Sequence, residues 1–136
     1  MRVHFREKFS QVRLLILDVD GVLTDGRIIY SSGGEELKFF NVQDGLGVYL
    51  LKLMGIPTVI VSAKSSSTIK MRAQDMGVED IYEDAYHKTQ VYEKIKSRYN
   101  LEDKNICFIG DDLVDLGILK RVCVPVAVRN ASREVK

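Results

Sequence analysis

The sequence predicts an α/β fold in which helices cover both faces of a mainly parallel five-stranded sheet. Apolar runs of strand length alternate along the chain with longer amphipathic segments, which is typical of strands joined by helical connections. The runs are almost continuously hydrophobic, which indicates strands that are buried on both faces. With 136 residues, 46% of them hydrophobic, the chain can bury a core without disulfides or a structural metal. We therefore expect one domain over residues 1–136.

Five apolar runs are the candidate strands. They are residues 12–17, 57–61, 80–82, 106–109 and 124–128. Interleaved with helices, they predict the sheet of a Rossmann-like three-layer α/β/α sandwich.

Apolar residues at helical spacing predict the helices between these strands. The predicted helices are residues 46–54, 66–76, 88–99 and, as a short final helix, 113–120. In the first of them, the apolar stripe consists of Leu46, Leu50, Leu53 and Met54. Gly55 and Gly77 directly follow the first two helices, where a glycine commonly ends a helix.

One segment breaks the alternation of strands and helices. Residues 27–30 and 36–40 flank the sequence Ser-Ser-Gly-Gly, which is the pattern of a β-hairpin with a glycine turn. The hairpin directly follows the end of the first strand. We therefore expect it to stand over the carboxyl end of the sheet, where open α/β folds bind their ligands.

Charge and cysteine content exclude several classes of protein. The 20 basic residues nearly balance the 19 acidic ones, which argues against a nucleic-acid partner held by bulk charge. Cys107 and Cys123 lie inside apolar runs and are interpreted as small buried hydrophobic residues in a reducing compartment. No segment approaches the roughly 18 apolar residues of a membrane span, and residues 1–11 lack an apolar leader. The sequence thus indicates a cytoplasmic protein without a membrane partner.

Two acidic clusters follow predicted strands. Asp18 and Asp20 end the first strand and run into Gly21, while Asp111, Asp112 and Asp115 follow the fourth run in the same way. If these two strands are neighbours, three or four carboxylates converge at one edge of the sheet. Such a cluster is costly unless a cation neutralises it, and Mg²⁺ prefers carboxylate, water and phosphate oxygens.

With that charge neutralised, phosphoryl chemistry becomes accessible. One carboxylate can attack phosphorus in line to form an aspartyl-phosphate, while a neighbouring carboxyl protonates the leaving oxygen and then activates water. For Asp112 and Asp115 an alternative stays open, because an aspartate after a strand often caps the next helix. That alternative is weaker for Asp18 and Asp20, since no helical pattern begins there.

Two further residues suit a phosphoryl site. Ser62 ends the second strand and can donate a hydrogen bond to a phosphate oxygen, although a serine at such a junction is more often a helix cap. Lys88 stands at the start of a predicted helix, where the helix dipole disfavours a cation, so a bound anion is a reason for its position. The alternative for Lys88 is an ordinary solvated lysine.

The order Asp18-x-Asp20, Ser62, Lys88, Asp111-Asp112 resembles the four motifs of the haloacid dehalogenase superfamily of phosphatases. Within it, residues 20–26, 40–45 and 110–115 are similar to those of the phosphatases of 3-deoxy-D-manno-octulosonate 8-phosphate (Kdo 8-phosphate). That group carries a small hairpin, here about residues 27–40, in place of a cap domain. The resemblance implies a Mg²⁺-dependent enzyme of lipopolysaccharide sugar biosynthesis that acts on a phosphorylated sugar acid as a homotetramer.

The resemblance also implies roles for individual residues. Asp18 is then the nucleophile and a metal ligand, Asp20 the general acid/base that binds metal through its carbonyl, and Asp111 the remaining metal carboxylate. Ser62 and Lys88 hold the phosphate, and Asp112 and Asp115 support the site. Besides Asp20 and Lys88, the implied substrate-binding residues are Asn41, Val42, Gln43, Asp44, Gly45, Tyr49, Lys64 and Arg72.

The chain departs from the family at several of these positions. It has Gln43, Tyr49 and Lys64 where the Kdo group usually carries arginine, and lysine replaces only the charge of an arginine, not its bidentate geometry. Related phosphatases of nonulosonate 9-phosphates are an alternative, but they tend to be acidic near position 64. Family members also usually continue to a glycine-containing tail that reaches a neighbouring active site, whereas this sequence stops at Lys136.

Two other classes of function fit the fold. A response-regulator receiver is also doubly wound, but its phosphoacceptor ends the third strand, whereas here the double aspartate comes late and a hairpin intervenes. A non-catalytic oligomerisation module is the second alternative, and it predicts assembly without phosphatase activity.

Overall fold

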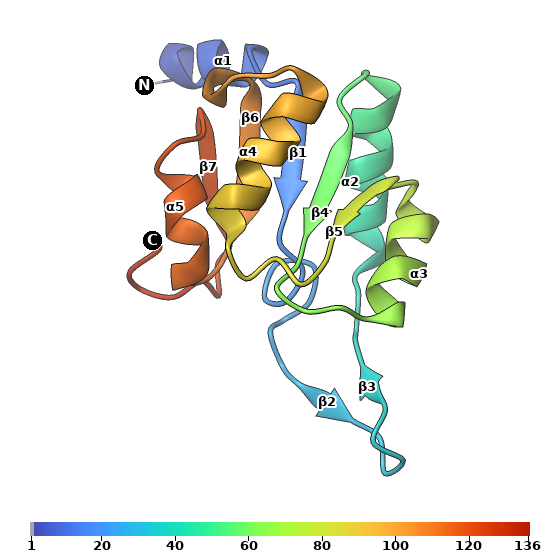
Figure 1. The fold of residues 1–136 in the computed structure, drawn as a ribbon. Coiled ribbons are helices and arrows are strands. Elements are labelled where there is room, and N and C mark those ends of the chain that lie inside the picture. Colours follow the sequence, from blue (N-terminus) through green and yellow to red (C-terminus); the bar gives the residue numbers. More distant parts are fainter. Residues whose placement is uncertain (1) are drawn as a thin grey trace.

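The computed structural model describes residues 2–136, and Met1 lies outside this range. A five-stranded parallel sheet forms its centre (Figure 1). The strands are β1 (Leu14–Leu17), β4 (Thr58–Val61), β5 (Asp80–Tyr82), β6 (Ile106–Gly110) and β7 (Val124–Ala127). Their order across the sheet is β5-β4-β1-β6-β7. The predicted strands are confirmed to within two residues at each end, and β1 lies between β4 and β6, so the two acidic clusters follow adjacent strands.

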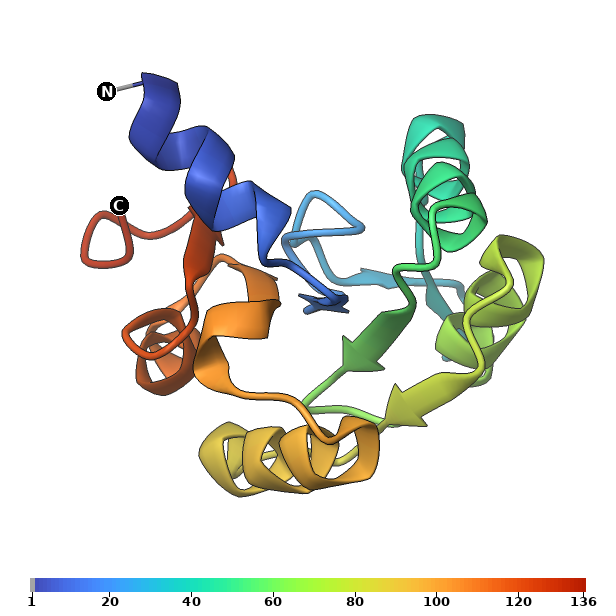
Figure 2. The ribbon, with the colours of Figure 1, turned by 90° about the horizontal axis from the view of Figure 1, so that it is seen from above.

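Helices cover both faces of this sheet, as predicted. On one face, α2 (Val42–Leu53) and α3 (Ser67–Met76) pack with Val48 and Ile69 against Leu15 and other sheet residues. Helices α4 (Lys88–Tyr99) and α5 (Leu116–Leu119) cover the other face (Figure 2). There, Tyr92 of α4 packs in one cluster with Ile16 of β1. The alternation of side chains in buried strands thus supplies two separate cores, one on each side of the sheet.

The first residues of two helices differ from the prediction because a capping side chain sets where each helix begins. Helix α2 begins at Val42, four residues before the predicted start, because the Asn41 side chain caps it by accepting the Gln43 backbone N–H. Ser66 caps α3 in the same way. The predicted short helix over 113–120 is divided into a 3₁₀ turn, Leu113–Asp115, and the single helical turn of α5. The predicted bounds of α4 are confirmed.

The apolar stripe of α2 does not face the core, although its spacing is helical as predicted. Leu46, Leu50, Leu53 and Met54 are all at least half exposed, and Val48 is the buried residue of this helix. The stripe therefore leaves an exposed apolar surface along α2.

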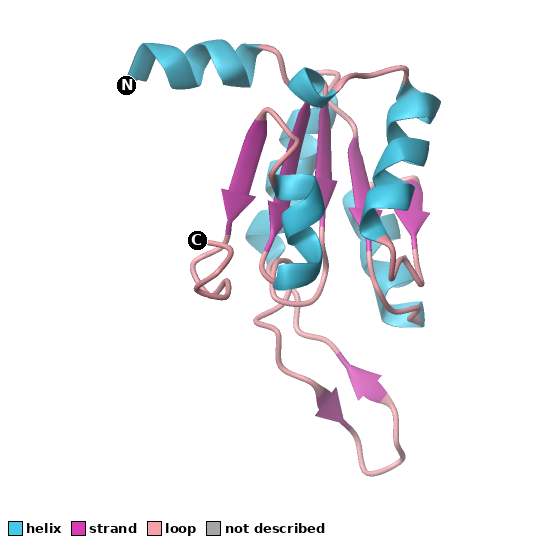
Figure 3. Cartoon of the chain, turned by 60° about the vertical axis from the view of Figure 1, so that its left-hand side comes forward, coloured by secondary structure: helices cyan, strands magenta, loops and turns pink. Residues whose placement is uncertain are grey.

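The predicted hairpin is present but shorter than expected. Its strands β2 (Ile29–Tyr30) and β3 (Glu36–Leu37) form a separate antiparallel pair that projects beyond the carboxyl end of the sheet (Figure 3). Phe40, at its base, packs against the core, whereas Tyr30 and Phe39 are exposed. Only two residues of each strand are paired, so most of the hairpin is held by loop and side-chain contacts instead of by strand pairing.

Helix α1 (Arg2–Ser10) was not predicted. Its phenylalanines, Phe5 and Phe9, are more than half exposed, so no buried stripe produced a helical signal in the sequence. Among residues 2–136, no helix is long and apolar enough to cross a membrane. Both cysteines are free; Cys107 is buried as expected, and Cys123 is partly buried.

A charged network ties α4 to the amino end of β6 and gives a testable pH dependence of stability. Asp103 accepts hydrogen bonds from Tyr92 Oη (2.7 Å) and Lys96 Nζ (2.9 Å). Burial raises the pKa of Asp103, but these bonds and the charges of Lys96 and Arg121 outweigh it and hold that pKa below its usual value. The ionised carboxylate therefore stabilises the fold above its unfolded-state pKa, and this contribution is lost as the pH falls through the lower folded-state pKa.

We expect Asp103→Asn to lower the free energy of unfolding at pH 7 by about 0.5–1 kcal/mol, because the side chain is partly exposed and screened by solvent. The deficit should be smaller at pH 3 than at pH 7. Urea unfolding at both pH values measures it, with the exposed Glu102→Gln as the matched control. An equal deficit at both pH values would contradict the ionic contribution.

Candidate active site

The first acidic loop leaves the central strand β1 and folds back at once. The N–H groups of Val22, Leu23 and Thr24 all donate to the Val19 carbonyl. The Thr24 hydroxyl accepts hydrogen bonds from the N–H groups of Gly21 and Gly26, both at 3.2 Å. This tight turn fixes Asp18 at the carboxyl end of the sheet, where the Val19 N–H donates to its Oδ1 at 2.8 Å.

The second acidic loop follows β6, and its three aspartates lie differently. Asp115 is fully buried, and its Oδ2 accepts the N–H groups of Asp111 (3.0 Å) and Asp112 (3.2 Å). Asp112 is exposed and caps the 3₁₀ turn through the Leu113 N–H, so the capping alternative is correct for this residue. Asp115 thus holds the loop backbone through these two hydrogen bonds. The Asp111 carboxylate faces the first loop.

The two loops are in direct contact. Gly21 has a φ of +86°, and a Cβ at this position would overlap the Asp111 carboxylate. The segment after β7 holds both loops, because Asn130 Nδ2 donates to the Gly21 carbonyl (2.9 Å) and the Ser132 N–H donates to the Asp111 carbonyl (2.8 Å). Nothing in the sequence pattern singled out Asn130 or Ser132, since their roles arise only from the path of the chain.

The Lys88 ammonium contacts two carboxylates of the cluster, those of Asp18 and Asp115. The ammonium is 3.1 Å from Asp18 Oδ1 and 2.6 Å from Asp115 Oδ1, and the Lys88 side chain is 2% exposed. The solvated alternative for this lysine is therefore wrong. Burial alone would lower the pKa of Lys88, but the charges and hydrogen bonds of the two aspartates outweigh burial and raise it. Lys88 is thus a fixed positive charge at the amino end of α4.

Burial has the opposite consequence for Asp18. It raises the pKa of this carboxyl to about 7, with a smaller contribution from the negative charge of Asp115 and against the attraction of Lys88. Burial also raises the pKa of Asp111, and the charges of its acidic neighbours add to this effect. Both carboxyls are therefore harder to ionise than an exposed aspartate, and a further cation beside them would favour their charged forms.

These residues fit a divalent cation. Carboxylate oxygens of Asp18, Asp111 and Asp115 lie within 4.8 Å of one another. Asp115 already serves Lys88 and two backbone N–H groups, which leaves Asp18 and Asp111 as the carboxylates that can hold a cation. An all-oxygen donor set with few protein ligands suits Mg²⁺, which keeps several water ligands.

The carboxylates open into a pocket of about 220 Å³. Its lining includes Asp18, Asp20, Lys64, Lys88 and Asp111. Ser62 lies beside it at the end of β4, buried, and its hydroxyl accepts the Lys64 N–H at 3.2 Å. The alternative that Ser62 caps α3 is wrong, because Ser66 is the cap.

Most of the predicted sugar-binding residues lie outside this pocket within a single chain. Asn41 and Asp44 line a separate depression with Thr24 and Asn130. Arg72 donates to the Asn41 carbonyl (2.8 Å) and does not line the pocket. The remaining residues of this set are on α2 and also lie outside the pocket: Val42, Gln43, Gly45 and Tyr49.

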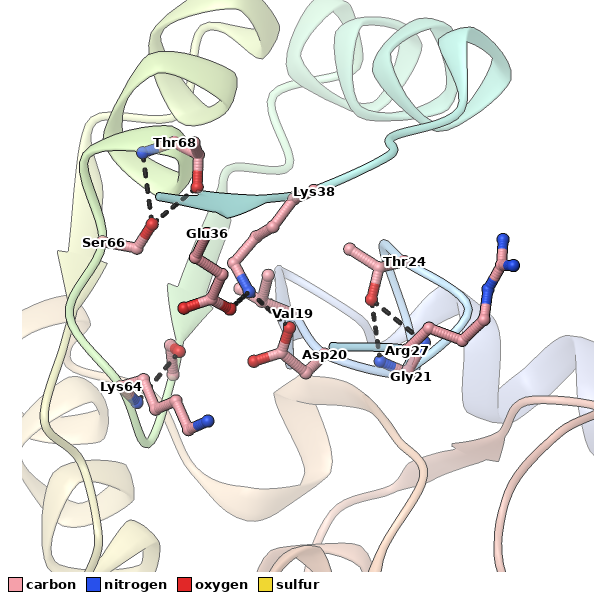
Figure 4. Close-up of polar contacts among 12 residues, drawn as sticks. Val19, Asp20, Gly21, Thr24, Arg27, Glu36, Lys38, Lys64, Ser66 and Thr68 are labelled. Carbon is pink, nitrogen blue, oxygen red and sulfur yellow. Dashed lines mark hydrogen bonds and ion pairs between the residues drawn. The ribbon is translucent and has the colours of Figure 1, made fainter. Parts of the chain in front are cut away.

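Lys38 is a site residue that the sequence did not reveal. From the hairpin, its ammonium donates to Asp20 Oδ1 at 2.7 Å and to Glu36 Oε1 at 2.8 Å (Figure 4). The sequence pattern of this segment predicts only strands and a turn. It does not indicate which side chain contacts the residues at the end of the sheet.

Mg²⁺ is expected to stabilise the chain through Asp111. A ligand present at 100 times its dissociation constant adds about 2.7 kcal/mol to the free energy of unfolding. Asp111→Asn should lose most of this stabilisation, whereas Asp112→Asn, which changes an exposed cap, should keep it. Thermal unfolding with and without Mg²⁺ measures the difference, and equal stabilisation of both variants would contradict the assignment.

Comparison with known proteins places the chain among phosphatases. The family model for haloacid dehalogenase-like hydrolases matches residues 54–136. The 3-deoxy-D-manno-octulosonate 8-phosphate phosphatase of Salmonella typhi is 34% identical over 128 residues, which cover 94% of this chain and 68% of the relative. The chain therefore spans about two thirds of this relative's length.

Solved structures agree with this similarity. The phosphatase of the same name from Moraxella catarrhalis, solved with magnesium, phosphate and Kdo, has a TM-score of 0.95 and 34% identity. The match covers all of this chain and 78% of that one. The Yersinia pestis phosphatase has a TM-score of 0.94 at 32% identity, over 97% of this chain and 71% of the other. The chain thus belongs to the haloacid dehalogenase-like hydrolases and, within them, to the family of Kdo 8-phosphate phosphatases.

Proposed function

We propose that this chain is a Mg²⁺-dependent phosphatase that hydrolyses Kdo 8-phosphate through a phosphoryl group carried on Asp18. The observation that carries the proposal is the position of Asp18 at the end of the central strand, between Lys88 and Asp111. Both the Val19 N–H and Lys88 contact Asp18 Oδ1, and we therefore assign Oδ2 to the attack on phosphorus.

In the first step, Asp18 Oδ2 forms a bond to phosphorus while the bond from phosphorus to the sugar oxygen breaks. Asp20 gives its proton to that oxygen, and the sugar acid leaves as an alcohol. In the second step, Asp20 takes a proton from water, which attacks phosphorus and releases phosphate and the free Asp18 carboxylate. Lys88 and Ser62 bind the phosphate oxygens.

The Asp18 and Asp111 carboxylates, with the Asp20 carbonyl, would hold Mg²⁺. When bound, the ion would supply positive charge that offsets the repulsion between the phosphate and these carboxylates. The residues present suit such an ion, as the donor set above indicates. Asp115 contributes by holding Lys88 and the Asp111 N–H in place. Asp112 supports the loop as a cap.

The Kdo 8-phosphate assignment is supported by the relatives of that name and by Lys64. This lysine lines the pocket beside Asp20, where a cation can attract the carboxylate of a sugar acid. The other implied substrate-binding residues lie outside the pocket of their own chain: Asn41, Val42, Gln43, Asp44, Gly45, Tyr49 and Arg72. We propose that they contact the sugar only in an assembled oligomer.

We further propose that the chain forms a cytoplasmic homotetramer. The exposed apolar side chains of the hairpin and of α2 support an assembly, because contiguous patches of this kind are typical of interfaces. They include Ile28, Tyr30, Phe39, Leu46, Leu50 and Leu53. Sedimentation equilibrium tests the assembly, and a monomer at micromolar concentration would contradict it.

Phosphate release with Mg²⁺ from a substrate panel tests the function. The panel contains Kdo 8-phosphate, a nonulosonate 9-phosphate, common hexose phosphates and p-nitrophenyl phosphate. A kcat/KM for Kdo 8-phosphate at least tenfold above all others is expected. Preference for the nonulosonate 9-phosphate would overturn the substrate assignment but keep the chemistry, and assembly without any turnover would indicate the non-catalytic module instead.

A further inference from the structure

We propose that Lys38 is a positioning residue that holds Asp20 in the orientation needed to protonate the leaving group. This inference rests on the proposed function, since it concerns the general acid/base of that reaction. It gives the hairpin a role inside its own chain's site, in addition to any role in assembly.

The Lys38 side chain is buried and makes two ionic contacts. It is only 3% exposed, although it belongs to a hairpin that is otherwise largely exposed. Its ammonium lies between Asp20 Oδ1 (2.7 Å) and Glu36 Oε1 (2.8 Å), as Figure 4 shows. Ordering a long lysine side chain costs rotamer entropy, and the two ionic contacts of the ammonium offset this cost. They connect the Asp20 carboxyl to the hairpin.

The contact engages only one oxygen of Asp20. Lys38 donates to Oδ1, and the Asp20 side chain remains 40% exposed where it lines the pocket with Asp18. Oδ2 is therefore the oxygen that can face a leaving group. Without Lys38, the carboxyl would rotate among its χ angles, and the population with Oδ2 directed at the substrate would fall.

Glu36 makes this contact compatible with the chemistry. A lysine paired with Asp20 alone would leave an uncompensated charge under the hairpin whenever Asp20 carries its proton. Because Glu36 also pairs with Lys38, the ammonium keeps a partner at either stage of the reaction. Arg27 offers a contrast, because this second cation of the hairpin segment is exposed and pairs with Asp25.

The test uses substrates that differ in their need for a general acid. For each substrate, kcat/KM reports the steps up to the departure of the leaving group. The Kdo leaving group departs as an alkoxide unless its oxygen is protonated, whereas p-nitrophenolate leaves readily without a proton. Lys38→Met should lower kcat/KM about 10–100-fold for Kdo 8-phosphate and less than about 3-fold for p-nitrophenyl phosphate.

Two conservative changes and one control sharpen this experiment. Lys38→Arg should restore most of the lost kcat/KM, and Glu36→Gln should give a smaller loss with the same dependence on the leaving group. Arg27→Met should leave both substrates unchanged. Circular dichroism establishes that each variant is folded, and should Lys38→Met fail to fold, Glu36→Gln carries the test.

The outcomes separate this inference from the proposed function. An equal loss on both substrates, or no loss on either, would overturn the role of Lys38 while the wild-type activity still supports the phosphatase. A wild-type chain that releases no phosphate from any substrate would overturn the proposed function, and the role of Lys38 with it.

Discussion

Replacing Asp18 with asparagine is expected to reduce phosphate release by at least about 10³-fold, because the amide cannot attack phosphorus and no other carboxylate occupies its place. The change is nearly isosteric, and Lys88 keeps its 2.6 Å contact with Asp115. Burial of the Asp18 carboxyl opposes its ionisation, so the neutral amide should cost little stability. Steady-state phosphate release, together with thermal unfolding of the same preparation, measures both effects.

The matched control for this variant lies in the same loop. Asp25 is an exposed aspartate that pairs with Arg27, and Asp25→Asn should retain activity within about twofold. Substantial turnover by Asp18→Asn would contradict the nucleophile assignment. A parallel loss in Asp25→Asn would indicate instead that the whole loop tolerates no change of charge.

The sheet and its acidic edge were predictable from the sequence because they depend on local signals. Buried parallel strands are continuous apolar runs, and the residues that follow them lie at one edge of the sheet. Once β1 and β6 are adjacent, Asp18 and Asp111 must approach each other, and their carboxylate oxygens lie within 4.8 Å in the structure.

The surfaces of the helices were less predictable. Apolar spacing in α2 indicates a helix with a stripe, but it carries no information on what covers the stripe. The sheet buries Val48, and the predicted stripe of Leu46, Leu50 and Leu53 faces outward. Helix α1 gave no signal for the related reason that its apolar residues are not buried at all.

Contacts between distant segments could not be predicted from the sequence. Lys38 reaches Asp20 across 18 residues, and Asn130 reaches the Gly21 carbonyl across 109. Neither contact has a spacing or a composition that distinguishes it from a surface lysine or a loop asparagine. Their recognition requires the path of the hairpin and of the segment after β7.

Lys88→Met is expected to lower the free energy of unfolding by about 3–5 kcal/mol at pH 8 without Mg²⁺, because it leaves buried carboxylates without their counter-charge. It should also abolish most of the activity, since the variant lacks the cation that we propose binds the phosphate. Urea unfolding in the presence of a chelator measures the stability. Lys70→Met is the matched control, because Lys70 is an exposed lysine 3.6 Å from Glu83, and its loss should cost less than about 0.5 kcal/mol.

The pH dependence of this deficit distinguishes lost charge pairing from lost packing. Burial already raises the pKa of Asp18 to about 7 while Lys88 opposes that rise, so removing Lys88 raises it further. A carboxyl whose folded-state pKa exceeds its unfolded-state pKa destabilises the fold at high pH, and the cost falls as the pH drops through the folded-state value. The deficit of Lys88→Met should therefore shrink between pH 8 and pH 5, and Mg²⁺ should reduce it at pH 8. A deficit that is the same at both pH values would contradict an ionic role of Lys88 and would mean that methionine packs poorly in its place.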